Sequence, residues 1–263
     1  MSLGGFSKED GRNILNLSKM MIRDRYIGSS MGIFWAVIHP LVLLGIYTFV
    51  FGFVLKPKVP GAETTLDYAI WFIGGFIVYL SISEGMGNSA ASVLAGSSLV
   101  KNIPMKTEMI PMASVLTSMV SLAVGIVFMT LLLILTGRFP TWHILLVPIV
   151  LLLHWLFLAG LGFFLSALTV FVRDVAQILP TVNLLIIFST PILYPLETLP
   201  QFFRWVTYFN PFYWMSQVYR DLLLFHRLPN GMGFLYWSLS SVVLFVLGLK
   251  FFRKLKGYFE MVL

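Results

Sequence analysis

Residues 141–170 read TWHILLVPIVLLLHWLFLAGLGFFLSALTV, a run without a single Asp, Glu, Lys or Arg. About 20 apolar residues in a helix cross the roughly 30 Å hydrocarbon core of a bilayer, so this run is long enough to span a membrane. It contains Pro148, and its length allows a helix that is tilted, kinked or broken. In the whole chain of 263 residues, 58% are hydrophobic, 11% are charged and the mean hydropathy is +0.89. A soluble domain carries about a quarter charged residues, so this composition indicates an integral membrane protein.

Apolar runs elsewhere in the chain extend this pattern to six predicted membrane-spanning helices. They lie near 34–55, 68–93, 110–136, 141–171, 176–195 and 231–250. The runs are rich in Leu, Phe, Gly and Pro and show no period-two alternation, which favours helices over a transmembrane barrel. No long apolar core precedes residue 30, so we expect the first span itself to direct insertion.

Basic residues are divided unequally between the two sides of such an arrangement. If both termini lie inside, the inner segments hold twelve Lys and Arg residues and the outer segments hold six. The inner set is Lys8, Arg12, Lys19, Arg23, Arg25, Lys101, Lys106, Arg173, Lys250, Arg253, Lys254 and Lys256; the outer set is Lys56, Lys58, Arg138, Arg204, Arg220 and Arg227. The positive-inside rule therefore favours an N-in, C-in topology. The net charge of +7 follows from this bias, and no basic run has the length or interleaved aromatic residues typical of nucleic-acid binding.

Residues 1–30 are predicted to form a cytoplasmic amphipathic helix in the membrane interface, ahead of a six-helix transmembrane domain at 31–263. Ser7 and Asp10 have the spacing of a capping box. The apolar face is formed by Ile14, Leu17 and Met21 and extends to Leu15 and Ile22, against the basic residues Lys8, Arg12, Lys19 and Arg23. Membrane lipid is the expected partner of this helix, because anionic headgroups attract its basic side.

Two connectors differ from ordinary loops. Between spans two and three, Pro104 and Pro111 bracket a stretch that is either a short helix parallel to the membrane or a simple connector. After span five, residues 196–230 are dense in aromatic residues and are split by the turn signal Asn210-Pro211. The pieces on either side are too short and too polar to cross the membrane, so they are predicted to form two re-entrant or interfacial helices at the outer leaflet.

The stretch FVRDVAQILP (171–180) places Arg173 and Asp174 side by side in the short inner turn between spans four and five. Each charge would cost about 2.5 to 3.5 kcal/mol at the centre of a membrane helix, so the pair suits a turn at the membrane surface. One interpretation is a polar turn, with Asp174 favourably placed near the N-terminus of the next helix. The other is a fixed contact for a cytoplasmic partner.

Residues that could carry chemistry are few. The chain has no cysteine, and its histidines, His39, His143, His154 and His226, show no metal-ligand spacing. No GxxxxGK[ST] phosphate loop is present, so this chain cannot hydrolyse ATP by that route, and we expect it to bind no cofactor or metal. Glu84 is the one carboxylate inside a predicted span, which makes it a functional candidate. Nearby Ser81, Ser83, Gly85 and Gly87 favour a hydrogen-bonded structural role for it as strongly, and His154 is interpreted as a core residue.

Three segments carry a resemblance to a known family: YIGSSMGIFWAVIHPLVLLGIYTFVFG (26–52), FVRDVAQILPTVNLLIIFSTPILYPLETLP (171–200) and FNPFYWMSQVYRDLL (209–223). In this order and spacing they resemble the transmembrane permease subunits of bacterial ABC exporters for polysaccharides. The O-antigen permeases are the most similar, and capsule and teichoic-acid permeases share the same landmarks. These landmarks are Gly32, Trp35 and Pro40, the Arg173-Asp174 turn, and Pro191, Tyr194 and Pro195 together with Asn210-Pro211.

The resemblance implies that the chain is half of a transporter in the bacterial inner membrane. Two copies would pair as a homodimer and dock a pair of cytosolic ABC ATPase subunits, which would bind ATP and magnesium in place of this chain. The N-terminal helix and residues 97–108 would face the ATPase, with Lys101, Asn102, Ile103 and Pro104 as coupling residues. Arg173 and Asp174 would lie at the inner mouth, and 196–230 would form an outer gate.

A lipid-linked polysaccharide substrate constrains the transport path. A polymer of many sugars is longer than the membrane is thick, so a single enclosed midplane pocket cannot hold it. We expect a continuous channel between the two copies, with weak repeated contacts that let the polymer both enter and leave. Aromatic faces suit the apolar faces of sugar rings, and the candidate channel-lining residues on spans one and five are Phe34, Trp35, Tyr47, Phe188 and Tyr194.

Other functions stay open at this point. Within the same class, the substrate could be a capsule or teichoic-acid polymer, a drug or a small lipid. A secondary transporter that works without ATP is disfavoured by the single intramembrane carboxylate and the lack of a clear inverted repeat. A membrane-embedded enzyme, such as a lipid-modifying transferase, is disfavoured because no carboxylates or histidines cluster near one face. The sequence therefore predicts a transport subunit rather than an enzyme.

Overall fold

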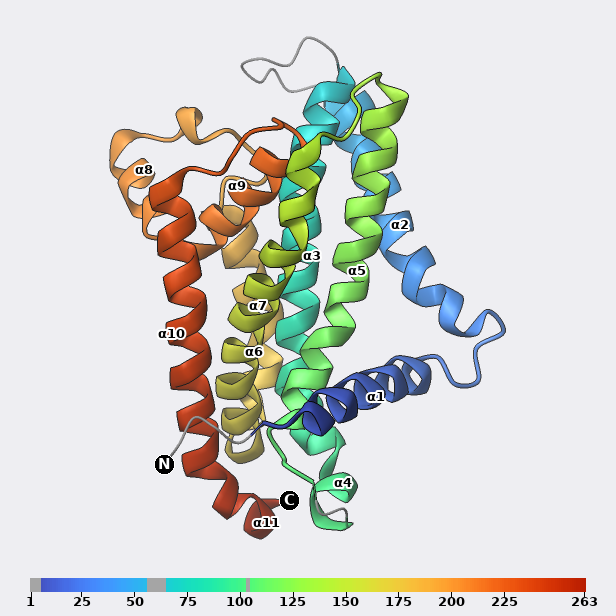
Figure 1. The fold of residues 1–263 in the computed structure, drawn as a ribbon, viewed down its shortest axis with the longest axis vertical. Coiled ribbons are helices and arrows are strands. Elements are labelled where there is room, and N and C mark those ends of the chain that lie inside the picture. Colours follow the sequence, from blue (N-terminus) through green and yellow to red (C-terminus); the bar gives the residue numbers. More distant parts are fainter. Residues whose placement is uncertain (1–5, 56–64, 103–104) are drawn as a thin grey trace.

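The chain folds into a bundle of long helices that lie side by side, with short helices at both ends (Figure 1). The computed structural model describes residues 6–55, 65–102 and 105–263, and no strand occurs within these ranges. The α-helices are α1 (Lys8–Arg25), α2 (Trp35–Phe49), α3 (Thr65–Ala95), α4 (Ser97–Asn102), α5 (Met109–Leu135), α6 (Val147–Phe171), α7 (Asp174–Ser189), α8 (Gln201–Tyr208), α9 (Pro211–Leu223), α10 (Gly231–Leu255) and α11 (Phe259–Val262). Short 3₁₀ or π turns join or extend them: η1 (Gly32–Phe34), η2 (Val50–Leu55), η3 (Trp142–Leu146), η4 (Leu196–Thr198) and η5 (Lys256–Tyr258). The prediction of an all-helical membrane protein is confirmed.

Five helices of the described part are long and apolar enough to cross a membrane. They are Gly32–Phe49, Leu66–Ala95, Met109–Leu135, Trp142–Phe171 and Gly231–Tyr258, and they match five of the six predicted spans. The remaining predicted span, 176–195, corresponds to α7, which is apolar but shorter than the other five.

Local sequence signals account for where several helices begin. The Ser7 hydroxyl accepts from the Asp10 backbone N–H, and the Asp10 carboxylate accepts from the Ser7 backbone N–H, so the predicted capping box opens α1. Pro148 lies in the first turn of α6, where its missing N–H is not needed, and it therefore starts that α-helix after η3 instead of kinking it midway. Asn210 caps α9 through its side chain, and Pro211 takes the first helical position, which confirms the predicted split of 196–230.

Of the two alternatives for the stretch between Pro104 and Pro111, the described residues 105–108 fit the simple connector. The short helix between the second and third spans is α4, which lies earlier, at Ser97–Asn102. Pro111 lies in the first turn of α5, a position that tolerates proline. Leu15 does not share the buried side of α1: Ile14 and Leu17 are buried against the bundle, whereas Leu15 is 54% exposed.

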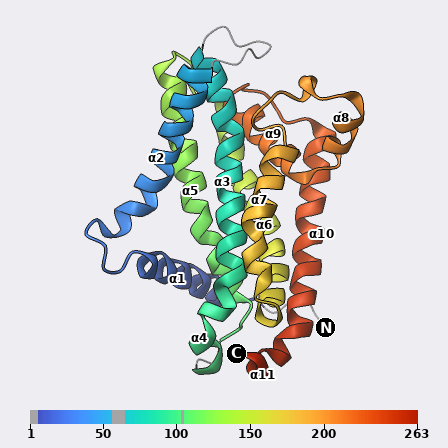
Figure 2. The same cartoon turned by 180° about the vertical axis from the view of Figure 1, so that it is seen from behind.

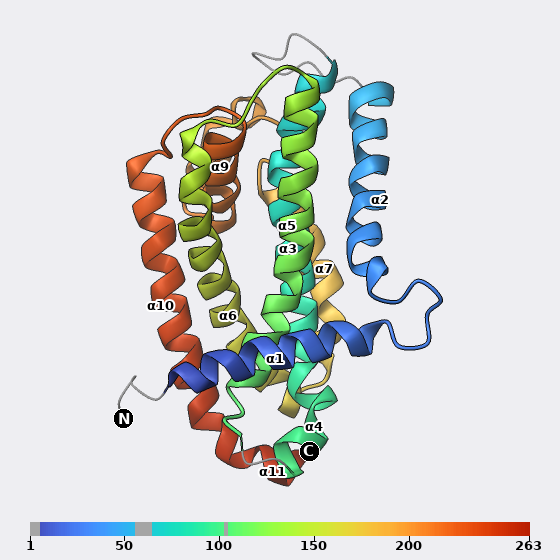
Figure 3. The same cartoon turned by 45° about the vertical axis from the view of Figure 1, so that its right-hand side comes forward.

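Helices α1 and α11, the first and last of the described chain, lie at the same end of the bundle, together with α4, and we call this the inner end (Figures 1 and 2). The opposite end carries α8 and α9 and is called the outer end. Helix α1 crosses the inner ends of the long helices almost at right angles to them (Figure 3). This is the placement expected of an amphipathic helix in the membrane interface.

Helix α3 forms the centre of the bundle, and α2 stands at its edge. In the most apolar stretch of α3, 78% of the residues are buried inside the protein. In the corresponding stretch of Gly32–Phe49, only 11% are buried. Helix α2 contacts α3 through an aromatic cluster near the outer end, where Tyr47 and Phe51 pack on Phe72 and Phe76. Toward the inner end, α2 diverges from the other helices (Figures 1 and 2). Much of its apolar surface is therefore left without a partner inside the chain.

Glycine allows α6 and α10 to approach at backbone distance. A Cβ atom built on Gly160 would lie 2.6 Å from the Leu244 carbonyl carbon and from the Phe245 nitrogen. A Cβ atom on Gly248 would lie 2.4 Å from the Gly160 carbonyl oxygen. Small residues at such crossings let membrane helices gain close van der Waals contact, which replaces the hydrophobic driving force that lipid cannot supply.

We predict that Gly160→Ala destabilises the folded protein, because the added methyl group meets backbone that cannot move away as a side chain would. Overpacking of this kind costs about 1 to 3 kcal/mol. The measurement is the thermal unfolding temperature of the purified protein in detergent, with Gly87→Ala as the matched control, since nothing lies within 4 Å of a Cβ at Gly87. Equal unfolding temperatures for the two variants would contradict the close α6–α10 contact.

Candidate functional site

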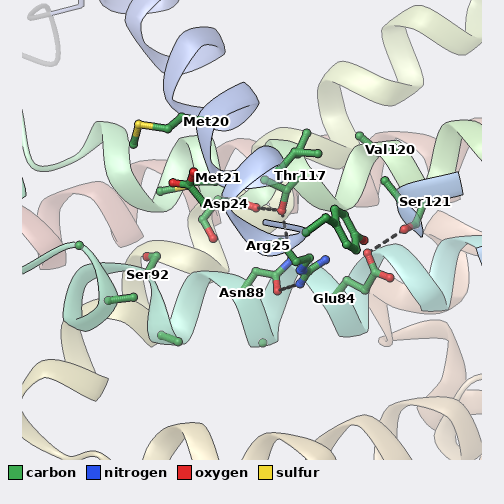
Figure 4. Close-up of a pocket in the computed structure, with 18 of the residues that line it drawn as sticks. Met20, Met21, Asp24, Arg25, Glu84, Asn88, Ser92, Thr117, Val120 and Ser121 are labelled. Atoms are coloured by element: carbon green, nitrogen blue, oxygen red, sulfur yellow. Dashed lines mark hydrogen bonds between the residues drawn. The ribbon is translucent and has the colours of Figure 1, made fainter. Parts of the chain in front are cut away.

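A cavity of about 420 Å³, with both polar and apolar walls, lies at the inner end, where the C-terminal part of α1 meets α3, α5 and the start of α2 (Figure 4). We call it the inner cavity. Its polar lining comes from three helices: Asp24 and Arg25 of α1, Glu84, Asn88 and Ser92 of α3, and Ser114, Thr117 and Ser121 of α5.

The inner cavity exists because two facing helices carry short side chains at helical spacing. Along α3, the residues that line it are Glu84, Gly87, Asn88, Ala91, Ser92 and Ala95. These positions fall on one face of a helix with 3.6 residues per turn, and Ser114, Thr117 and Ser121 do the same on α5. Glycine, alanine and serine on α3, facing serine and threonine on α5, leave open space, and the hydroxyl and amide groups make part of its wall polar.

Hydrogen bonds link the three helices around the inner cavity (Figure 4). The Arg25 guanidinium donates to the Asn88 amide oxygen over 2.5 Å, and the Asn88 amide nitrogen donates to the Thr117 hydroxyl over 3.1 Å. The Thr117 hydroxyl in turn donates to the Ser114 carbonyl oxygen. The interfacial helix α1 is thereby connected through α3 to α5. Sequence reasoning missed Arg25 and Asn88, because residues 63 positions apart show their pairing only in the folded chain.

Glu84, the predicted intramembrane candidate, lies on the wall of the inner cavity. The Ser121 hydroxyl of α5 donates to one Glu84 carboxylate oxygen over 2.8 Å. This partner is on a neighbouring helix, not among the serines that surround Glu84 in the sequence. Ser83 accepts a hydrogen bond from the Asn183 amide of α7 instead. The hydroxyl, amide, carboxyl and guanidinium groups together form an array of donors and acceptors that suits a hydroxyl-rich or anionic ligand.

The predicted inner-mouth residues Arg173 and Asp174 lie at the inner end but outside the inner cavity. Asp174 is the first residue of α7 and Arg173 precedes it, so the predicted helix boundary is confirmed. Both side chains are exposed. The ion pairs found among the described residues do not include this pair, so both side chains face outward separately.

The predicted coupling residues fall only partly within the described ranges. Lys101 lies exposed near the end of α4, and Asn102 is the last residue of that helix. Ile103 and Pro104 lie outside the described residues. Helix α4 is at the inner end, close to the C-terminal α11 (Figure 3).

An ionic cluster, which we call the inner junction, follows this connector. One oxygen of the buried Glu108 carboxylate accepts from Arg253 over 2.9 Å and from Lys256 over 2.8 Å. Lys106 pairs with Asp10 of α1 at 2.5 Å. The inner junction therefore ties the start of α5 to both α1 and the end of α10. The sequence presents these residues as ordinary charges of a polar connector, so their burial was not foreseen.

The electrostatics of the inner junction favour the ionised carboxylates. Burial by itself would raise the pKa of Glu108, but the hydrogen bonds from Lys256 and Arg253 outweigh it and hold the pKa below its usual value. The pKa of Asp10 is also lowered, first by the hydrogen bond from Lys106 and then by that from the Ser7 backbone.

The outer end contains a second cavity, of about 380 Å³, beside α9. Arg220 of α9 lies on its wall although only 1% of that residue is exposed. Its guanidinium donates to the carbonyl oxygens of Trp71 over 3.1 Å and Pro191 over 2.9 Å, and it lies 3.9 Å from the Trp71 ring centroid. The ion pairs found among the described residues do not include Arg220. The neighbouring Asp221 is paired with Arg227 instead. Carbonyl dipoles and the aromatic face stabilise this buried charge.

Arg220 was predicted only as an outer-loop charge, and its burial depends on two glycines of α3. A Cβ on Gly75 would lie 2.5 Å from one terminal guanidinium nitrogen of Arg220, and a Cβ on Gly74 would lie 3.1 Å from its Cγ. The Gly74-Gly75 pair was the available signal, because adjacent glycines inside an apolar helix indicate a close approach. Through Arg220, α9 is fixed both to α3 and to the connector that follows α7.

The five predicted channel-lining residues are not gathered around one cavity. All five lie in the described part of the chain, and none of them lines the inner cavity. Phe34, Trp35 and Phe188 are exposed on the surface of the single chain. Tyr47 is half-buried in the aromatic cluster with Phe72 and Phe76, and Tyr194 donates to the Phe188 carbonyl oxygen.

A bundle of apolar, membrane-length helices is the architecture of an integral membrane protein. Residues 12–224 match the family described as ABC-2 type transporter, and the chain belongs to that family. The family relationship predicted from the sequence is thus confirmed, and with it a transport role in a multi-pass membrane protein.

Similar proteins cover almost the whole chain. An O-antigen export system permease protein RfbA of Myxococcus xanthus is 25% identical over 88% of this chain and 87% of its own length. One of the same name from Klebsiella pneumoniae is 27% identical over 92% and 91%. A polysialic acid transport protein KpsM of Escherichia coli is 21% identical over 88% and 89%.

We predict that Glu108→Gln loosens the inner junction and lowers the free energy of unfolding by about 2 kcal/mol at neutral pH, as expected for lost hydrogen bonds to a charged group. Because the folded pKa of Glu108 is depressed, its contribution is present above the unfolded pKa and is lost as the pH falls through the folded pKa. The difference in unfolding temperature between wild type and Glu108→Gln should therefore be largest near pH 7 and shrink below about pH 4.3.

The control for this pH dependence is Glu9→Gln, which changes an exposed carboxylate of α1 in the same way. Its effect on the unfolding temperature should be much smaller than that of Glu108→Gln, because an exposed carboxylate in the first turn of a helix contributes only about 0.3 to 1 kcal/mol. A constant difference between Glu108→Gln and wild type down to strongly acidic pH would show that the ionised carboxylate is not what stabilises the junction.

Proposed function

We propose that this chain is the membrane-spanning subunit of an ATP-driven exporter that moves a lipid-linked, O-antigen-like polysaccharide across the bacterial inner membrane. Two copies form the channel, and a separate pair of ABC ATPase subunits supplies the energy. The observation that carries this proposal is membership of the ABC-2 type transporter family together with relatives that are named as O-antigen export permeases over about nine-tenths of the chain. The polysialic acid relative, at lower identity, supports an acidic capsule-type polymer as the second candidate.

The proposed topology has six spans with both termini in the cytoplasm. Helix α7 serves as the fifth and shortest span: its 16 residues rise about 24 Å, and the connector at 190–195 completes the distance to the outer end. The position of the first and last described helices, α1 and α11, at the inner end supports an even number of crossings (Figure 1). The charge bias of the sequence supports the cytoplasmic side for that end.

The proposed homodimer rests on apolar surface that the single chain leaves open. On α2 the side chains of Val42, Ile46 and Phe49 are each more than half exposed, as are those of Leu185 and Phe188 on α7. Both helices flank the central α3. A second copy placed against them would enclose a path next to α3, with Phe34, Trp35 and Phe188 along it. Aromatic rings suit sugar rings there, because stacking contacts are non-directional enough to let a polymer slide.

The inner cavity suits the cytoplasmic start of this path. Arg25, Asn88, Thr117 and Ser121 offer hydrogen-bonding groups to sugar hydroxyls or to a phosphate headgroup. Helix α4, with the exposed Lys101, and helix α1 lie at the same end and form the proposed ATPase-facing surface (Figure 3). Because the inner junction connects this surface to α5 and α10, ATPase movement has a direct physical route into the bundle.

The direct test is co-purification with a phosphate-loop ATPase from the native host. We expect a tagged permease to retain such an ATPase, and Lys101→Glu to weaken that retention because it reverses a charge on the proposed contact surface. Lys250→Glu, which reverses an exposed lysine near the inner end of α10, is the matched control and should retain the ATPase normally. A wild-type permease that exports polymer without any ATPase would contradict the proposed class.

We also predict that Arg173→Ala blocks export, that Arg173→Lys keeps part of it, and that Asp174→Asn weakens it without unfolding the subunit. Two copies would bring four such charges to the inner mouth, where a lipid-linked polymer with an anionic headgroup enters. Arginine holds phosphate with a planar fork, whereas lysine acts as a point charge. The measurement is surface polysaccharide at matched subunit levels, and normal export by all three variants would make the pair a helix boundary only.

A further inference from the structure

An apolar groove of about 460 Å³ lies apart from the transport path proposed above, between α5 and α6 where α1 crosses them. Its walls include Gly11 and Leu15 of α1, Met119 and Ala123 of α5, and Leu152 and Trp155 of α6. Figure 3 shows α1 lying across the inner ends of the long helices, and its residues Gly11 and Leu15 form the wall of the groove on that side. We call it the α1 groove.

The lining of the α1 groove offers hydrocarbon and almost nothing else. Gly11 has no side chain, and the other five residues named above have aliphatic, thioether or aromatic side chains. The one polar atom among these side chains is the Trp155 indole nitrogen. That nitrogen donates to the Met112 carbonyl oxygen over 3.4 Å, so it is already satisfied. An acyl chain fits such a surface, whereas a sugar or a free anion would lose its hydrogen bonds there.

A basic stripe borders the groove along α1. Lys8, Arg12, Lys19 and Arg23 follow one another at spacings of four, seven and four, which places them on one side of the helix next to the groove-lining Leu15. All four side chains are exposed. The ion pairs found among the described residues do not involve any of them.

The order of surfaces around α1 matches the depth profile of a membrane leaflet. Ile14 and Leu17 face the bundle, Leu15 faces the hydrocarbon groove, the basic stripe comes next, and the polar Asn13 and Asn16 lie beyond it. A lipid with an acyl chain in the groove therefore has its phosphate at the level of the lysines and arginines. Snorkelling of these long side chains suits that level.

We propose that the α1 groove binds one anionic phospholipid of the cytoplasmic leaflet, with an acyl chain between α5 and α6 and the phosphate held by Lys8, Arg12 and Lys19. The assignment of the leaflet rests on the orientation in the proposed function. The bound lipid fills the angle between α1 and the bundle and fixes the interfacial helix to α5 and α6. The positive charges of α1 lie next to the apolar groove and attract an anionic headgroup. They therefore favour an anionic lipid over a neutral lipid with the same acyl chains.

The test is native mass spectrometry of the purified full-length permease, after delipidation, with added phosphatidylglycerol or phosphatidylcholine of identical chains. We expect one phosphatidylglycerol per chain to be retained selectively. Ala123→Phe, which fills the groove, should remove that bound lipid. The combined change Lys8→Gln, Arg12→Gln and Lys19→Gln should reduce the preference for phosphatidylglycerol by about tenfold or more.

Matched controls separate this site from general lipid contact. Leu239→Phe enlarges an exposed side chain on α10, and Lys250→Gln with Lys254→Gln removes two exposed lysines near the inner end of the same helix. Both controls should keep the bound phosphatidylglycerol.

Equal retention of the two lipids by wild type, or unchanged retention in Ala123→Phe, would overturn the proposal. Loss of the dimer in Ala123→Phe with lipid retention unchanged would assign the groove to a second copy instead. These readouts do not depend on export, so they stand or fall separately from the proposed function.

Discussion

Inside a membrane, every polar group must find its partner within the protein, and α3 is the helix on which this constraint falls most heavily. Water cannot satisfy those groups in hydrocarbon, so each unsatisfied one costs several kcal/mol. Helix α3 satisfies three of its polar side chains through neighbours on both sides: Glu84 and Asn88 bond to α5, and Ser83 bonds to α7. The same short polar residues that permit these bonds also leave the inner cavity open. One set of side chains on α3 therefore both holds the central helix to its neighbours and forms the inner cavity, the candidate site of substrate contact.

The two ends of the bundle are fixed by different chemistry. At the outer end, the buried Arg220 joins α9 to α3 and to the connector after α7 through carbonyl oxygens and the Trp71 ring. At the inner end, Glu108 joins the start of α5 to α10 through Arg253 and Lys256. A buried charge is costly to leave without ion-pair or hydrogen-bond partners, so both attachments favour one arrangement of the helices over alternatives. Between these fixed ends, α2 is the least attached span, and it carries the surface proposed to meet a second copy.

Much of the fold follows from short-range signals in the sequence. Apolar runs place five spans, the Ser7 and Asp10 spacing places the start of α1, and Asn210-Pro211 separates α8 from α9. The misses arise from partners distant in the chain or from positional effects. Pro148 suggests a kink but occupies the first turn of α6, where proline is harmless. Arg220 and Glu108 look like surface charges, because the glycines and basic residues that admit them lie 145 or more positions away. The channel-lining residues are the hardest part of the site to predict from the sequence. Hydrophobic periodicity shows which residues share a face of one helix, but not which of these faces meets a second copy of the chain.

The central claim is that the open faces of α2 and α7 meet a second copy and enclose the export path. The chain contains no cysteine, so single cysteines introduced at chosen positions report without background. The most direct measurement is cross-linking in native membranes with a short bifunctional thiol reagent, using cysteines placed in turn at Val42 and Ile46 of α2 and at Leu185 and Phe188 of α7. Leu235 and Leu239 of α10 are equally exposed controls. We expect covalent dimers from α2 or α7 positions and none from α10; dimers from α10 alone, or from no position, would contradict a channel built between these faces.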